Sequence, residues 1–224
     1  MPTTNALTWD DSGERLFETG VDHVVLYLLD AQGAYSTGVA WNGVTSIAES
    51  PSGAEPTDLY ADNIKYLTLM SAETLSATLE AYTYPDEFEA CDGSAELVAG
   101  ATIGQQPRAR FGLCYRTRLG NDVDGDNHGY KLHMIYGCQA SPSQRTYQTV
   151  NDSPEAITFS WEINTTPVNV TGFKPTSYIS VDSTQANADK LADLEEILYG
   201  GESNTARLPL PDEIKTKLTP PSKP

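Results

Sequence analysis

The sequence has few basic residues and lacks any long apolar run. It carries 14 Lys and Arg against 31 Asp and Glu in 224 residues, which gives a net charge of −17. A protein that binds nucleic acid without regard to sequence needs basic residues to neutralise phosphates, so this charge argues against that class. It argues equally against a protein that binds anionic membranes. No apolar run reaches the ~18–20 residues of a membrane span, and we expect no membrane contact.

Cysteine is also scarce. The three cysteines, Cys91, Cys114 and Cys138, show no C-x-x-C spacing. The first 17 residues lack a basic segment followed by an apolar one, so we expect no signal peptide. An odd number of cysteines without a secretion signal indicates reduced thiols and synthesis in a cytosol.

Signatures of catalysis are missing from the sequence. It contains no glycine-rich phosphate loop, no H-E-x-x-H and no G-x-S-x-G motif. His128 falls in a predicted turn and His133 on a predicted hairpin, while His23 lies in an apolar run and is most simply a core or cross-strand residue. Paired carboxylates are common only because the composition is acidic. We therefore expect no enzyme and no cofactor.

Strand patterns dominate what is present. Residues 23–29 (HVVLYLL) form a near-continuous apolar run, which is typical of a strand buried on both faces. Residues 157–164 (ITFSWEIN) alternate apolar and polar side chains and predict a strand with one face in water. Further strands are predicted at 65–72, 75–85 and 177–182.

Helical patterns are few. Leucines recur at helical spacing within 186–199, and Gly200 provides a stop, so one long helix is predicted there. A short helical turn is predicted at 85–91, with a proline in its first turn. The chain is therefore expected to be mainly β, with one flanking α-helix.

Two stretches have the composition of connecting segments. Residues 48–63 are rich in Pro, Gly, Ser and acids, and they predict a long loop that interrupts the strands and is unusual enough to need a function. Residues 207–224 carry five prolines and predict an extended arm or tail.

The stretch 121–130 (NDVDGDNHGY) raises the question of a metal site. Counted from Asp122, a calcium loop of the EF-hand type needs glycine at its sixth position and glutamate at its twelfth, where this chain has Asn127 and His133. Alternating strand patterns flank the stretch on both sides. This arrangement favours the tip of a hairpin over a cation-binding loop.

The predicted hairpin at 108–140 is the most basic part of the chain. It holds five basic residues against three acids, a local charge of +2. Four of these residues are predicted to share one face of the first strand: Arg108, Arg110, Arg116 and Arg118. A solvated polar face is the ordinary interpretation. In so acidic a chain the alternative is a subunit interface that meets carboxylates, which self-assembly would supply.

The order of these features resembles that of the major tail proteins, the tail-tube subunits of long-tailed, non-contractile bacteriophages. The likeness rests on order and spacing over residues 13–200 rather than on one invariant motif. It runs through 13–27 (GERLFETGVDHVVLY), 50–67, 83–93, 111–138 and 157–183, and then an acidic helix.

The resemblance implies two packed antiparallel sheets, a β-sandwich or barrel, related in fold to bacterial secretion-tube proteins. It implies an N-terminal arm at 1–20, a β domain at 21–200 and a Pro-rich C-terminal arm at 201–224. It also implies hexameric rings stacked into a hollow tube through which double-stranded DNA passes without specific binding. The implied partners are further copies of the chain, a tail terminator, a tape measure protein, a distal tail protein and a tail assembly chaperone. The implied location is the virion, after synthesis in the bacterial host cytoplasm.

Within this interpretation, residues 48–63 form an inter-ring loop with Leu59 and Tyr60 as apolar anchors. The arginine face of the hairpin should point away from the DNA channel, because an inward row of arginines would hold phosphates. The competing class is a monomeric β-sandwich binding module that uses 121–129 as a cation- or ligand-binding loop. A tube subunit forms large particles, whereas such a module stays monomeric.

Overall fold

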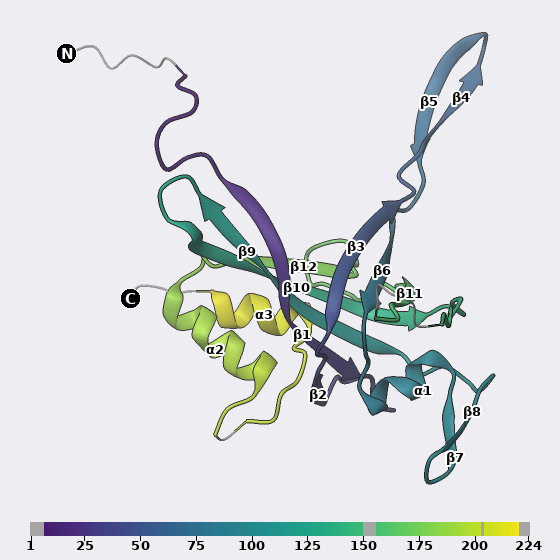
Figure 1. Cartoon of the computed structure of the whole chain (residues 1–224). Helices are drawn as coiled ribbons and strands as arrows, with labels where there is room; N and C mark the ends of the chain where they lie inside the picture. The colour runs from purple at the N-terminus through teal and green to yellow at the C-terminus, as the bar shows by residue number, and fades with distance from the viewer. Residues whose placement is uncertain (1–6, 150–155, 203, 220–224) are drawn as a thin grey trace.

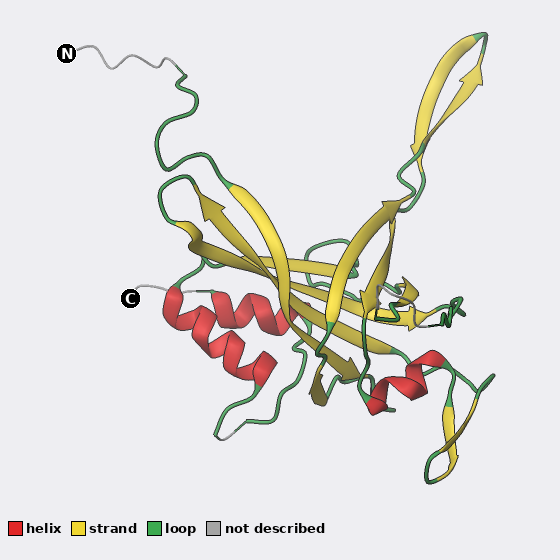
Figure 2. Cartoon of the chain, viewed as in Figure 1, coloured by secondary structure: helices red, strands yellow, loops and turns green. Residues whose placement is uncertain are grey.

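The computed structural model describes residues 7–149, 156–202 and 204–219, and it shows a mainly β protein of packed antiparallel sheets (Figures 1 and 2). This confirms the predicted fold class, although three α-helices rather than one accompany the sheets. The strands are β1 (Phe17–Leu28), β2 (Thr37–Ala40), β3 (Val44–Ser52), β4 (Pro56–Ala61), β5 (Ile64–Met70), β6 (Thr74–Ala81), β7 (Ala95–Val98), β8 (Ala101–Ile103), β9 (Phe111–Asn121), β10 (Gly125–Ala140), β11 (Phe159–Asn164) and β12 (Tyr178–Asp182). The helices are a 3-10 turn η1 (Asp86–Phe88), α1 (Glu89–Asp92), α2 (Ala188–Tyr199) and α3 (Pro211–Leu218).

Strand β10 joins the two layers of the sandwich. Strand order is β2-β1-β9-β10-β11-β6-β3, and β12 also pairs with β10. The first part of β10 pairs with β9 and β12, whereas its last residues pair with β11. Between these parts Gly137 has φ +62°, and a Cβ there would lie 2.2 Å from the carbonyl oxygen of Thr166. Only glycine fits this corner, where the strand passes from one layer to the other.

The inner core lies between the layers and is centred on aromatic rings. The Trp161 ring has its centroid 5.1 Å from that of Phe88 and 5.6 Å from that of Trp41. Trp161 and Ile163 of β11 are buried, and Glu162 and Asn164 are exposed. The alternation predicted for this strand is therefore confirmed.

A second core covers the outer face of the layer that contains β1, β9 and β10. Helices α2 and α3 supply Leu191, Leu194, Leu198 and Ile214 to it. In β1, Val24 and Leu26 belong to the inner core, while Val25 and Tyr27 belong to the outer one. This double burial explains the continuous apolar run at 23–29.

The prediction that His23 is a core or cross-strand residue is wrong. His23 has φ +52° and is exposed, and the pairing of β1 with β9 shifts register on either side of Asp22. A bulge therefore turns this residue outward, immediately before the four buried residues of the strand, 24–27.

The loop predicted at 48–63 is also wrong, because most of these residues are strand. β3 and β4 contain eleven of these sixteen residues, and the hairpin continues through β5 into β6. Pro51 lies in β3, which pairs with β6 alone and ends the sheet. An edge strand tolerates a proline because its outward backbone groups need no ladder partner.

The C-terminal segment is not an extended arm over the residues described. After residue 204 the chain returns to the outer core, where Leu208 and Ile214 are buried. The Tyr136 hydroxyl donates a hydrogen bond of 2.9 Å to the carbonyl of Pro209. Pro211 opens helix α3, a position that needs no backbone N–H. The prolines at 220, 221 and 224 lie outside the described residues.

At the N-terminal end, β1 begins at Phe17, within the predicted arm, and residues 7–16 lead away from the sheets (Figure 1). In the described ranges no helix has the length and apolar character to cross a membrane.

Replacing Ile214 by Ala tests the packing of the C-terminal segment. Ile214 is buried against the outer core, so its truncation should lower the free energy of unfolding by about 2–4 kcal/mol. Denaturant titration measures this loss. Lys217→Ala, on the exposed side of the same helix, is the control and should change stability by less than about 0.5 kcal/mol. Equal stability of the two variants would show that the segment does not pack on the body.

Candidate assembly surfaces

Residues 53–73 form a projecting hairpin, which we call the β-arm. Strands β4 and β5 pair only with each other, as a separate two-stranded sheet beyond the ends of β3 and β6 (Figure 1). A Cβ on Gly53 would lie 2.3 Å from the carbonyl oxygen of Ala72. The two strands of the hairpin therefore pass close to each other where the β-arm leaves the body. At its tip, Asp62 and Asn63 both have positive φ, the backbone that tight two-residue turns use.

The β-arm exposes apolar side chains on both faces. Successive residues of a strand point to opposite sides. A register shift at Tyr66 interrupts this alternation in β5, so the faces follow from the pairing with β4. Ile64, Leu67 and Leu69 lie on one face and Met70 lies on the other, and these four residues and Tyr66 are all exposed. A strand with apolar residues on both faces is typical of one covered on both faces. No other part of the chain that the structure describes covers this hairpin on either face.

The predicted anchors Leu59 and Tyr60 both belong to the β-arm. They lie on β4 at a register shift opposite β5, and their exposed fractions are 41% and 70%. The sequence pattern predicts an ordinary strand for the apolar residues of β5, and the predicted contact surface between copies does not include them. The segment 64–70 (IKYLTLM) carried the signal, because its apolar residues occupy both parities of a strand that follows a polar stretch.

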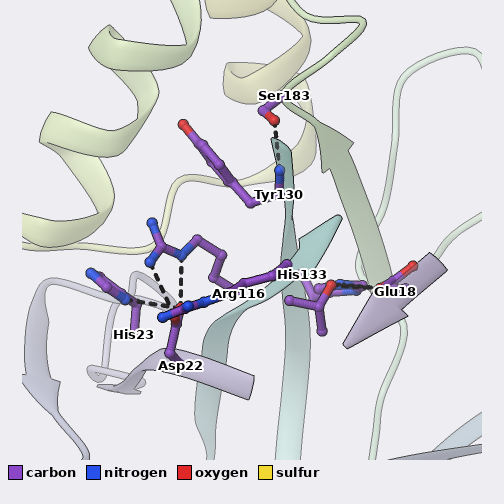
Figure 3. A network of polar contacts seen from close by, with 9 residues as sticks. Glu18, Asp22, His23, Arg116, Tyr130, His133 and Ser183 are labelled. Carbon is purple, nitrogen blue, oxygen red and sulfur yellow. Dashed lines mark hydrogen bonds and ion pairs between the residues drawn. The ribbon is translucent and has the colours of Figure 1, made fainter. Parts of the chain in front are cut away.

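Two of the predicted arginines bind a carboxylate of their own chain. Asp22 lies opposite Arg116 in the pairing of β1 with β9. The Arg116 Nε donates to Asp22 Oδ1 at 2.7 Å and its Nη2 donates to Oδ2 at 3.1 Å (Figure 3). Arg118 reaches the same Oδ2 at 3.2 Å. The guanidinium of Arg116 lowers the pKa of Asp22 to about 2.

The other two arginines do not share that strand, so the predicted single face is wrong. Arg108 and Arg110 precede β9, which begins at Phe111. Arg108 Nη1 lies 3.5 Å from Asp92 Oδ1 at the end of α1, and Arg145 also contacts Asp92. Arg110 is exposed, and within the described residues no ion pair includes it. Alternation cannot be extended across the end of a strand, which is why the pattern misled.

A second polar network closes the end of the inner core. His133 is buried and stacks on Tyr115, with the ring centroids 4.8 Å apart. Its Nε2 lies 2.7 Å from Thr117 Oγ1, and its Nδ1 lies 2.7 Å from the Tyr178 hydroxyl. Thr117 in turn donates to Glu18 at 2.5 Å. Burial lowers the pKa of His133, which favours the neutral ring.

These contacts tie together strands that the backbone ladder leaves unpaired. Glu18 also accepts a hydrogen bond of 2.8 Å from Lys131 of β10. The Tyr115 hydroxyl of β9 donates to Glu49 of β3. Strand β3 is thereby linked to the opposite layer near the base of the β-arm, although β9 and β3 share no ladder.

The turn at 121–129 uses its polar groups for its own backbone. The Asn121 side-chain oxygen accepts from the backbone N–H of Asp124 at 2.5 Å, and Asp122 accepts from the N–H of Gly13 at 3.0 Å. The Asn121 amide donates to Asp124 at 3.1 Å. The stretch is a hairpin tip, as expected. Across the described ranges no three His, Cys, Asp or Glu residues gather as a metal site would require.

No family model matches the chain, and no curated protein matches it.

Replacing Asp22 by Asn tests the ion pair between β1 and β9. At pH 7 this variant should lose about 1–2 kcal/mol of folding stability, since hydrogen bonds to charged partners contribute that much. The native pKa of Asp22 is depressed, so its contribution is present above pH 4 and disappears as the pH falls through about 2. The stability difference between variant and parent should therefore vanish in acid, which denaturant titrations at several pH values would measure.

Asp193→Asn is the matched control for this experiment. Asp193 pairs with Lys190 on the exposed surface of α2, at 3.1 Å, and such a pair contributes only about 0.2–0.5 kcal/mol. A pH-independent loss in the Asp22 variant would contradict the assigned role.

Proposed function

We propose that this chain is the tail-tube subunit of a long-tailed, non-contractile bacteriophage. On this proposal it forms hexameric rings that stack into a hollow tube, through which double-stranded DNA is ejected into the host. The observation that carries the proposal is the β-arm. It is a two-stranded hairpin outside the sandwich with exposed apolar side chains on both faces.

Physical chemistry favours a covered state of the β-arm. An isolated two-stranded hairpin is marginally stable in water, and stability requires further strands or a packed layer. Exposed apolar patches beyond a few hundred Å² mark interaction surfaces in soluble proteins. The arm extends the core strands β3 and β6 past the body of its own chain (Figure 1), and on this proposal a neighbouring copy covers it.

Composition supports the passage of DNA through such an assembly. Copies that each carry a net charge of −17 create an acidic wall, which repels phosphates and lets a duplex slide. The proposal places the protein in the virion, after synthesis in the host cytoplasm. Its partners are further copies, a tail terminator, a tape measure protein, a distal tail protein and a tail assembly chaperone.

The arginines have different parts in this proposal. Arg116 and Arg118 hold Asp22 within the subunit, so reversing both charges would place three carboxylates together and destabilise the fold itself. Arg108 holds Asp92. Arg110 is exposed and is the one of the four best suited to meet a carboxylate of another copy. All four are proposed to point away from the DNA channel.

Removing the β-arm tests the proposed function. Ser52 and Thr74 are opposed residues in the β3–β6 ladder, so an Asn-Gly turn can replace residues 53–73 and close a tight hairpin. We expect a folded subunit that no longer assembles, while the parent forms rings or tubes in negative-stain microscopy. A parent chain that stays monomeric at high concentration would overturn the proposal, as would normal tubes from the deletion variant.

Single substitutions provide a matched pair for the deletion. Tyr66→Ser changes an aromatic residue of the β-arm that is 68% exposed, and Phe173→Ser changes one elsewhere that is 71% exposed. Only Tyr66→Ser should weaken assembly, because only Tyr66 is proposed to be buried against another copy. Loss of an exposed aromatic side chain elsewhere should have no effect.

Arg110→Glu tests the remaining arginine. The substitution should leave the unfolding midpoint unchanged, because this side chain is exposed. It should slow assembly and shift it to higher salt, where like charges are screened. Light scattering at several ionic strengths measures both effects, and Lys217→Glu is the control of equal charge change. If both variants assemble alike, the change in net charge, rather than loss of a specific contact of Arg110, causes the slower assembly.

A further inference from the structure

A second unpartnered hairpin lies far from the β-arm. Strands β7 and β8 form their own two-stranded sheet, next to α1, at the opposite end of the sandwich in Figure 1. Leu97 and Val98 are 63% and 62% exposed, and Ile103 is exposed as well. Like the β-arm, this hairpin has too few strands to be stable without a further partner.

The base of this hairpin is firmly held. Phe88 and Cys91 are buried in the inner core immediately before it. After it, the backbone N–H of Gln106 donates to Gly93 and that of Ala109 donates to Ala90, each at 2.9 Å. Arg108 and Arg145 both contact Asp92 at the same place. The fold therefore presents exposed apolar residues on a fixed support.

The hairpin is also nearly free of charge. Residues 94–104 contain one charged side chain, Glu96, in a chain whose net charge is −17. Two copies of so acidic a protein repel one another least where one contact surface carries little charge. A neutral apolar surface is thus suited to a second copy of this chain.

We propose that the hairpin formed by β7 and β8 is the surface on which the β-arm of a second copy docks. This inference rests on the proposed function, since it assumes that the β-arm contacts another copy. Two complementary surfaces at opposite ends of one subunit make a head-to-tail contact, which repeats without closing and so builds an open-ended stack. Docking covers the exposed apolar residues of both hairpins at once.

Disulfide cross-linking tests the contact directly. Tyr66→Cys and Leu97→Cys place one accessible thiol on each hairpin, in separate chains. The three native cysteines are free and buried, and burial raises the pKa of each thiol, so they react slowly. Mild oxidation of the mixed chains should give a disulfide between the two variants, identified by mass spectrometry after proteolysis. Phe173→Cys mixed with Leu97→Cys is the control and should give none.

A loss-of-contact variant separates this inference from the proposed function. Leu97→Asn combined with Val98→Asn should raise the concentration needed for assembly about tenfold or more, with an unchanged unfolding midpoint. If the parent assembles and this variant assembles equally well, or if disulfides form only between two copies of the Tyr66→Cys variant, the docking surface is overturned and the proposed function stands. If the parent does not assemble at all, both are overturned.

Discussion

Burial of one sheet on both faces is the constraint on which the rest of this structure depends. Strands β1, β9 and β10 carry side chains into the inner core on one face and into the helix-covered core on the other. Residues 204–219 complete the outer core, so this part of the chain does not form a free arm. Such a sheet also fixes the positions of the strands that leave it. The two projecting hairpins are therefore attached to a body with little freedom to rearrange.

Polar side chains link the strands around one end of the inner core, where the backbone hydrogen bonds between strands end. Asp22 binds two arginines of β9, and Glu18, His133 and Tyr115 link the strands around the end of the inner core. These contacts lie within one chain, so under the proposed function assembly depends mainly on apolar surfaces. In a strongly acidic chain, polar pairs within the chain and apolar contacts between copies are a favourable combination. Carboxylates paired within the chain no longer compete for a partner, while the apolar side chains of the two hairpins remain exposed.

The sequence identified most of the sandwich, and its failures have specific causes. The strand at 157–164, the helix at 186–199 and the hairpin around 121–130 follow from periodicity and turn chemistry, which are local properties. Pro51 and the acids near it suggested a loop, because composition does not reveal that a strand lies at a sheet edge. The apolar run predicts a core or cross-strand position for His23. The bulge that turns this residue outward depends on the pairing of β1 with β9, which the run does not reveal. The pairing of Arg116 with Asp22 joins residues that are distant in sequence. No local pattern of residues along the sequence reveals it.

The β-arm is continuous with two strands of the core, and this continuity has a mechanical meaning. β3 and β6 run from the inner core to the base of the arm, and β6 is also paired with β11. A force applied along the arm is directed parallel to these strands. It therefore loads the hydrogen bonds of the β6–β11 ladder together, in shear, rather than opening them one at a time. A subunit held by this arm can bear tension directed along the arm without its sheet peeling apart.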